Sequence, residues 1–480
     1  MTSRGGRAMS RRLKVALIAA LGSVLLIAGI GAVVVRNHGS SDRRAWDPRI
    51  EPFAKSVERA RNLTFDHPVK VRFLDDAEFE KTVRQDRKDL DADDRKDIKE
   101  ATELFRAFGL ISGDVDLFDA FNDATGSGTL AYYSFEDRAI TVRGSELTLA
   151  SHATLVHELT HALQDQRFGI SELSEKFNKK SEDGEPTTEG AALDAIVEGD
   201  AERVADVYRR GLSPKEQKAL KRAETKSEGK LDDLEGIPDV VLTLIGAPYA
   251  LGEALTQAVA SQDEEALNDL FRDPPPDDSV LLDPLKAIKP LSKPADVKIP
   301  ALAEGEKSFD SGQVGSLVTY LMLAERISVK DALKAADAWH GDAFVGFTRD
   351  SVPCARVEYA ATTAAGASLL SSAFTEWIAA GPTSIASITG EGKRLTFESC
   401  DPGKGAKVSE DAATNALELV ATRSYLAFGV LTAGASAKVA RCFARRTVDE
   451  FSADELVDPS FGVGDPTVVK RIQTLAASCR

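Results

Sequence analysis

The 480-residue sequence predicts a mixed α+β fold, because helical and strand patterns follow one another along the chain. The clearest helical pattern is TLVHELTHALQDQ at residues 154–166, where leucine recurs every four residues and forms one apolar face. Strand patterns precede it at Val69–Leu74 and at Leu130–Val142, where a charged turn separates two strands. A second, acidic helix is expected at Thr188–Tyr208. The polar stretch Ser171–Pro186 between the two helices is expected to be a surface loop.

A run of 21 uncharged, mostly apolar residues, Val15–Val35, lies near the start of the chain. As a helix it would span roughly 32 Å, which is enough to cross the hydrocarbon core of a bilayer. Basic residues precede it, so we expect residues 1–14 in the cytoplasm and everything after Arg36, including the linker 36–50, outside it. A cleaved signal peptide is the alternative, but its apolar core is usually about 7–15 residues long and ends at a small-residue cleavage site. The longer run, without a clean site, favours an uncleaved single-pass anchor.

The net charge of the chain is −16, and this charge is unevenly distributed. The first 35 residues contain five basic and no acidic side chains, which leaves a net charge of −21 for the remainder. An acidic surface repels polyanions, so this composition argues against nucleic acid or an anionic membrane surface as the main partner. Contact with the membrane is expected through the N-terminal helix.

Two smaller units are expected in the last third of the chain. Strand-like segments around an apolar helix predict a small α/β unit at residues 339–405, and the alanine-rich residues 406–480 predict a separate helical module. All four cysteines lie in these units, beyond the membrane span, where an even number suggests disulfides. Of the three possible pairings we prefer Cys354–Cys400 with Cys442–Cys479, because each pair brackets one compact block. Each bond would stabilise the fold by about 3–4 kcal/mol.

The segment HELTH at His157–His161 places the motif HExxH on the predicted central helix. Its two histidines stand four residues apart on one face, close enough to bind one metal ion, and neutral imidazoles suit Zn²⁺. Glu158 lies one step around the helix, where its carboxylate can act as general base on a water molecule at the metal. The alternative is two histidines that are satisfied in a core or exposed on a helix surface. Three of the six histidines, including His152 off the ligand face, fall within ten residues, and we favour the zinc site.

A catalytic zinc site needs a third protein ligand and an open position. In zinc peptidases whose third ligand is Glu, this residue comes from a later helix packed antiparallel to the first. We prefer Glu198, because apolar residues precede it and a glycine follows, which suits a carboxylate turned inward. Glu202 lies four residues on, on the same face, and is expected to orient a ligand histidine. Asp194 or Glu202 as the ligand, and an ordinary solvated acidic helix, are the alternatives.

These residues resemble a family of bacterial and archaeal membrane-associated zinc metallopeptidases of the gluzincin-like type, which combine HExxH with a downstream Glu. The resemblance is most specific at Ala139–Gly144 (AITVRG), at residues 154–166 and at Val197–Ala201 (VEGDA), and it covers about residues 50–405. It implies a zincin-like domain at residues 51–338 that hydrolyses peptide bonds in a peptide or protein substrate.

Position by position, the resemblance implies that His157, His161 and Glu198 bind Zn²⁺ and that Glu158 is the general base. The sequence departs from the family pattern where such proteins often carry His-Pro after a proline-rich run, because Asp283-Pro284 stands there instead. If that histidine stabilises the oxyanion, another residue must replace it, and the candidates are His340, Tyr249, Tyr132 and Tyr133. Two alternatives therefore stay open: an inactive zinc-binding scaffold, and an envelope protein-binding module whose working part is C-terminal.

Overall fold

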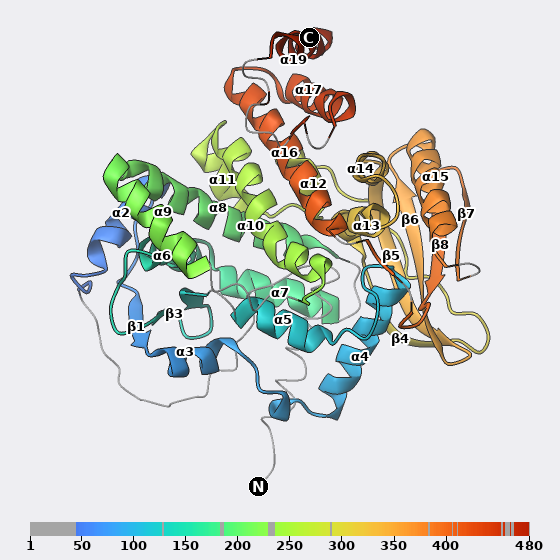
Figure 1. Cartoon of the computed structure of the whole chain (residues 1–480), viewed down its shortest axis with the longest axis horizontal. Helices are drawn as coiled ribbons and strands as arrows, with labels where there is room; N and C mark the ends of the chain where they lie inside the picture. Colours follow the sequence, from blue (N-terminus) through green and yellow to red (C-terminus); the bar gives the residue numbers. More distant parts are fainter. Residues whose placement is uncertain are drawn as a thin grey trace.

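The computed structural model describes residues 45–126, 129–182, 187–228, 236–288, 290–382, 385–405, 407–409, 411–452, 455–456, 461 and 465–479. The expected membrane helix at residues 15–35 and the cytoplasmic segment 1–14 lie outside these residues. Within the described ranges, no helix combines the length and the apolar character needed to span a bilayer. The fold is mixed α+β, as predicted, with two small sheets on opposite sides of a group of helices (Figure 1).

The structure contains many short and medium-length elements. The helices are α2 (Glu51–Arg61), α3 (Asp76–Val83), α4 (Ala92–Ala107), α5 (Leu117–Gly126), α6 (Ser151–Phe168), α7 (Ile170–Glu182), α8 (Glu189–Gly211), α9 (Pro214–Glu228), α10 (Asp239–Ala260), α11 (Glu264–Arg272), α12 (Ser279–Leu282), α13 (Gly315–Ala324), α14 (Val329–Ala336), α15 (Ala364–Ala380), α16 (Ala412–Thr432), α17 (Ala437–Glu450) and α19 (Pro466–Ser478), with 3₁₀ turns η1 (Arg87–Asp89) and η3 (Pro284–Ala287). The strands are β1 (Lys70–Leu74), β2 (Ala131–Ser134), β3 (Ala139–Arg143), β4 (Lys307–Gly312), β5 (Trp339–Arg349), β6 (Val352–Ala361), β7 (Ala386–Glu391) and β8 (Arg394–Cys400).

The three-stranded sheet has the order β1–β3–β2, with β1 parallel and β2 antiparallel to β3. These strands confirm the strands predicted at Val69–Leu74 and Leu130–Val142, which precede the HExxH helix in the sequence. α6 packs on this sheet through an apolar cluster in which Leu155 and Leu159 join Ile140 and Val142 of β3. Gly169 ends α6 in the left-handed conformation (φ 66°), which glycine adopts without steric cost. The predicted central helix is thus confirmed, and the edge strand β2 lies beside it.

The prediction of a loop at Ser171–Pro186 is wrong for most of that stretch, because α7 runs through it as far as Glu182. Residues 183–186 lie outside the described part of the chain. Ile170, Leu173 and Phe177 recur at helical spacing, and this stripe packs into an apolar cluster with α8 and α10. Burial of the stripe outweighs the polar, charge-rich composition that suggested a loop.

α8 and α10 cross at very short distance, and two glycines permit the crossing (Figure 1). A Cβ atom placed on Gly199 would lie 2.0 Å from the carbonyl carbon of Gly252. A Cβ on Gly252 would lie 1.9 Å from the carbonyl oxygen of Ala195. Any larger residue at either position would therefore push the two backbones apart. Because Gly199 directly follows Glu198, this crossing sets where the Glu198 carboxylate points.

α10 continues through the Gly-Ala-Pro-Tyr segment at residues 246–249, with Pro248 inside the helix. Proline removes one helical hydrogen bond and normally kinks or ends a helix. Here α10 is packed between α8 on one side and α16 on another, and most of its apolar residues are buried. This packing maintains the helix and carries Tyr249 to the neighbourhood of α6.

The second sheet has the order β4–β5–β6–β8–β7 and is antiparallel throughout. α15 covers one face with Phe374 and Trp377, whose rings pack against Phe397 of β8. α4 contributes Phe108, at its C-terminal cap, which meets the ring of Phe344 on β5. The expected α/β unit is therefore extended by β4 and contacted by a helix from the first part of the chain.

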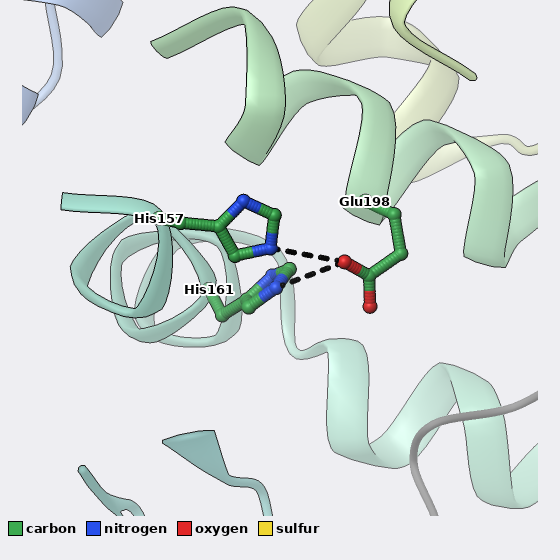
Figure 2. Close-up of side chains that lie close together, drawn as sticks. All are labelled: His157, His161 and Glu198. Carbon is green, nitrogen blue, oxygen red and sulfur yellow. Dashed lines mark hydrogen bonds and ion pairs between the residues drawn. The ribbon is translucent and has the colours of Figure 1, made fainter. Parts of the chain in front are cut away.

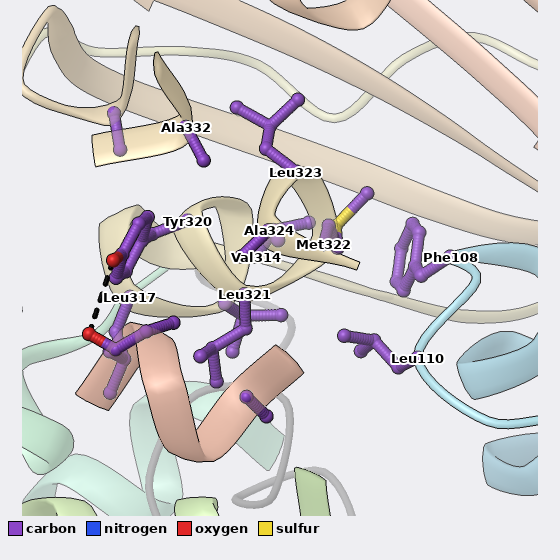
Figure 3. Close-up of a cluster of buried hydrophobic side chains, with 14 of the residues drawn as sticks. Phe108, Leu110, Val314, Leu317, Tyr320, Leu321, Met322, Leu323, Ala324 and Ala332 are labelled. Carbon is purple, nitrogen blue, oxygen red and sulfur yellow. Dashed lines mark hydrogen bonds between the residues drawn. The ribbon is translucent and has the colours of Figure 1, made fainter. Parts of the chain in front are cut away.

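Both predicted disulfides are confirmed. Cys354–Cys400 joins directly opposed residues of β6 and β8, and Cys442–Cys479 joins α17 to the end of α19. The helical character expected for the C-terminal residues is also found, and α16 packs on α10, while the Tyr320 hydroxyl of α13 donates to the carbonyl of Ala416 (Figure 3). The division of the chain at residues 338 and 405 stays a prediction, and one large apolar core joins the neighbouring segments.

The N-terminus of α13 is capped by two buried carboxylates. Asp342 accepts hydrogen bonds from the backbone N–H groups of Val314 and Gly315, at 2.7 and 2.9 Å. Asp278 accepts from those of Ser316 and Leu317, at 2.9 and 3.0 Å. Together they satisfy the N–H groups that a helix leaves without internal partners at its start. Burial raises the pKa of Asp278 to about 6 and that of Asp342 to about 7.

Candidate metal centre

His157 and His161 lie one turn apart on α6 and point toward the same space (Figure 2). Their rings are 4.6 Å apart, edge to face, and the residues are 8% and 4% exposed. Glu198 projects from α8 into the same space. One donor atom from each of the three residues lies within 4.8 Å of the other two. The sequence prediction that these three side chains meet therefore agrees with the structure.

The spacing of the donor atoms fits a single metal ion. Oε2 of Glu198 is 3.1 Å from Nε2 of His157 and 3.3 Å from Nε2 of His161 (Figure 2). Two ligands of a tetrahedral ion with bonds of about 2.0–2.1 Å stand about 3.3 Å apart, so these distances are those of neighbouring ligands. Two imidazole nitrogens and one carboxylate oxygen could hold a divalent cation, and this donor set alone does not identify zinc.

The carboxylate and the imidazoles perturb one another strongly in the metal-free state. Burial alone would lower the pKa of His157, but the hydrogen bonds to Glu198 and Glu202 outweigh it and raise the pKa to about 10. Burial would raise the pKa of Glu198, yet the two imidazoles lower it well below its ordinary range. The site therefore stabilises a carboxylate next to positive charge, and a bound cation would supply that charge.

The two alternative third ligands occupy different places. Glu202 faces the other side of the His157 ring, with its Oε2 3.4 Å from Nδ1, and its second oxygen pairs with Arg209 at 2.7 Å. This is the orienting position expected for Glu202. Asp194 is 4% exposed and lies one turn before Glu198, but it does not belong to the group of three donors. The geometry favours Glu198 over both.

Glu158 is held beside the histidines without joining the donor group. Its Oε2 accepts a hydrogen bond of 2.7 Å from the backbone N–H of Tyr133 on β2. Burial raises the pKa of Glu158 above its ordinary range. A carboxylate with a raised pKa is a stronger base, and it accepts a proton more readily near neutral pH. The edge strand thus positions the residue predicted to be the general base.

Of the four candidates for oxyanion stabilisation, Tyr249 is the one whose ring lies against a histidine of the donor group. Its ring stacks on that of His157, with the two ring centroids 5.9 Å apart. The hydroxyl of Tyr133 instead donates to Asp165 at 3.0 Å, while Tyr132 packs against Phe79. His340 lies on β5 of the five-stranded sheet.

Asp283, the first residue of the Asp283-Pro284 pair, contacts the C-terminal helices. Asp283 lies between α12 and η3, and its carboxylate pairs with Arg441 at 2.6 Å and with Arg445 at 3.5 Å, both from α17. It also caps η3 by accepting from the backbone N–H of Leu285. In this chain the position serves to attach the C-terminal helices.

A pocket of about 630 Å³ lies at the C-terminal end of α6 and does not include the three donors. Tyr133, Asp165 and Phe168 are among the residues that line it.

One neighbour of the donor group, Gln164, was not predicted from the sequence. Its Oε1 lies 3.1 Å from Nδ1 of His161. Its position three residues after His161, on the same helix face, is a signal that could have identified it.

Comparisons of the chain with protein-family models, with curated proteins and with solved structures find no match. The assignment of the site therefore rests on the geometry of its own residues.

Proposed function

We propose that this chain is a zinc-dependent peptidase of the gluzincin-like type, anchored to the cell membrane by residues 15–35 and acting outside the cytoplasm. The observation that carries the proposal is the convergence of His157, His161 and Glu198, with the Glu158 carboxylate held beside them by a backbone N–H. This combination supplies three ligands and a base in a buried site, which is the set that metal-assisted hydrolysis requires.

Bound zinc would polarise the substrate carbonyl and lower the pKa of a water molecule from about 15.7 to about 7. Glu158 would accept a proton from this water as its oxygen attacks the carbonyl carbon of the peptide bond. The same carboxyl would then give the proton to the leaving amine as the C–N bond breaks. Burial, which raises the pKa of Glu158, suits it to both transfers.

Tyr249 is the residue that we assign to stabilising the negative charge on the carbonyl oxygen. Burial and the nearby carboxylates raise its pKa well above the ordinary value, so the hydroxyl keeps its proton and can donate it in a hydrogen bond. The ring stacks on that of His157, which brings the Tyr249 side chain beside the donor group. Tyr249 would then take the role of the histidine that the resembled family often carries at the position of Asp283.

The second candidate is a zinc-binding scaffold without hydrolytic activity, and the Asp283-Pro284 departure is the observation that favours it. One variant, Glu158→Gln, distinguishes the peptidase from the inactive scaffold. Glu158→Gln keeps the size of the side chain and removes its basicity, so a peptidase would retain zinc and lose cleavage of a casein or peptide-library substrate. A scaffold would bind zinc in both forms and cleave in neither.

The metal content of the full-length protein, purified in detergent without chelator, tests the site directly. We expect about one zinc per chain in the wild type and much less in Glu198→Ala, measured by elemental analysis. One zinc in both proteins would move the third ligand to Asp194 or Glu202. No zinc in either would refute the peptidase and the scaffold together, and would leave a protein-binding role for the C-terminal helices.

A further inference from the structure

A continuous row of buried polar side chains leads from His161 to α2. We propose that Gln164 is a positioning residue that fixes which nitrogen of His161 faces the metal, and that Asp200 and Arg61 hold Gln164 in place. The inference rests on the metal site proposed above. It assigns a role to three residues that HExxH and the downstream Glu leave unexplained.

The orientation of the Gln164 amide is determined by its partners. Its Nε2 lies 3.0 Å from the backbone carbonyl of Val197 and 3.0 Å from Oδ2 of Asp200. A backbone carbonyl can only accept a hydrogen bond, so the amide nitrogen must face this side. The opposite orientation would place oxygen against oxygen twice. Oε1 of Gln164 must therefore face His161.

This orientation fixes the tautomer of His161. Oε1 of Gln164 is an acceptor 3.1 Å from Nδ1 of His161, so Nδ1 must carry a hydrogen. In a neutral imidazole the other nitrogen, Nε2, then carries the free lone pair. Nε2 is the atom that faces Glu198 at 3.3 Å in the donor group. Gln164 thus prepares the correct nitrogen for binding a cation.

Charged groups hold the far end of the row. Asp200 is fully buried, and its Oδ2 pairs with Nε of Arg61 at 2.8 Å while Oδ1 pairs with Arg203 at 3.0 Å. Arg61 is 1% exposed and also donates to Glu264 and Asn268 of α11. Gln164 is 1% exposed. Residues from α2, α6, α8 and α11 therefore leave the amide little freedom to rotate.

The two histidines are supported differently, which provides an internal comparison. Nδ1 of His157 faces Glu202 at the longer distance of 3.4 Å, and the Glu202 side chain is 28% exposed. Water can reach that contact more easily than the buried contact between His161 and Gln164. The inference therefore predicts that the two Nδ1 hydrogens exchange with solvent at different rates.

The test uses full-length protein loaded with Co²⁺, because this ion shifts the proton signals of its histidine ligands far from the rest of the ¹H NMR spectrum. We expect two exchangeable imidazole N–H signals in the wild type. Glu202→Gln should move the signal of His157 and so assign both. After transfer to D₂O the His161 signal should persist longer than the His157 signal. Equal or faster exchange at His161 would overturn the inference. This measurement needs no substitution in the row of side chains from His161 to Arg61.

The decisive variant is Gln164→Met, which has a side chain of similar length and no hydrogen-bonding amide. We expect the His161 N–H signal to broaden or disappear while the His157 signal stays, and Co²⁺ binding to weaken about 10- to 100-fold. The matched control is Gln166→Met, the same change two residues later in α6, where the side chain bonds to the backbone of Asp66 and His67. The control should leave both signals and the affinity unchanged.

Other outcomes separate the inference from the site on which it rests. Unchanged N–H signals and affinity in Gln164→Met would show that Gln164 does not position His161, with the metal site itself intact. If the wild type binds no Co²⁺, the metal site and this inference both fail. If Gln164→Met does not fold, the D₂O exchange of the wild type still decides the question.

Discussion

The crossing of α8 and α10 predicts a large effect for Gly199→Ala. The added Cβ would lie 2.0 Å from the carbonyl carbon and 2.2 Å from the carbonyl oxygen of Gly252, where ordinary contacts are 3.4–4 Å. Both neighbours are backbone atoms, so no side chain can rotate away. The helices must therefore separate locally by about 1.4 Å or more, and overpacking of this kind costs about 1–3 kcal/mol, occasionally more.

The same displacement would disturb the metal centre, because Glu198 precedes Gly199 and α10 carries Tyr249. A shift of about 1.4 Å is large beside the separations of 3.1 and 3.3 Å between the Glu198 oxygen and the two imidazoles. A misplacement of about 1 Å in a catalytic group can cost about 100-fold in rate. We therefore expect Gly199→Ala to lose both stability and metal.

Thermal unfolding and metal content measure the two effects on the same sample. The control is Gly211→Ala at the end of the same helix, where an added Cβ meets nothing within 4 Å. Removing the backbone freedom of glycine there should be neutral or stabilising by up to about 1 kcal/mol. If Gly199→Ala unfolds at the wild-type temperature and binds a full equivalent of metal, the reasoning about the close crossing is wrong.

Three further predictions follow from the site and from the capped helix α13. Glu158→Gln should retain zinc by elemental analysis and lower the rate of peptide hydrolysis by about 10²- to 10⁴-fold, and unchanged cleavage would refute the general-base role. Tyr249→Phe should lower kcat by about 10²-fold or more with little change in KM or metal content, whereas a change in KM alone would assign the hydroxyl to substrate binding. Burial raises the pKa of Asp342 from 3.8 to about 7, so the folded state binds this proton more tightly than the unfolded state, and the contribution to stability falls as the pH rises from about 4 to 7. The difference in unfolding temperature between pH 5 and pH 8 should therefore be smaller in Asp342→Asn than in the wild type, and an identical difference would contradict the assignment.

The local part of the site was predictable because short-range spacing encodes it. A four-residue interval places His157 and His161 on one helix face, and the glycine after Glu198 marks a carboxylate turned toward a neighbouring helix. The stop at Gly169 follows from the same local chemistry. These inferences need only the geometry of a helix and the conformational range of single residues.

The remaining features depend on contacts between distant segments. No local pattern indicates that Arg61 pairs with Asp200, which lies on a different helix far along the chain. α7 has a composition that suits a loop, and only the partners of Ile170 and Phe177 make it a helix. Pro248 would end an isolated helix, yet the packing of α10 between α8 and α16 maintains it. In each case tertiary burial outweighs the local preference.

The place of Arg61 at the last position of α2 limits how the protein can be shortened. A soluble fragment that discards the first 61 residues would remove, together with the hydrophobic N-terminal run, a guanidinium group that neutralises Asp200. The carboxylate would keep the hydrogen bond from Gln164 and the ion pair with Arg203, but it would lose the cover of α2. The latest safe starting point for such a fragment lies before Trp46, whose ring packs on Phe65 and joins the apolar cluster under α6. A fragment trimmed further would test a damaged site, and its inactivity would say nothing about the intact protein.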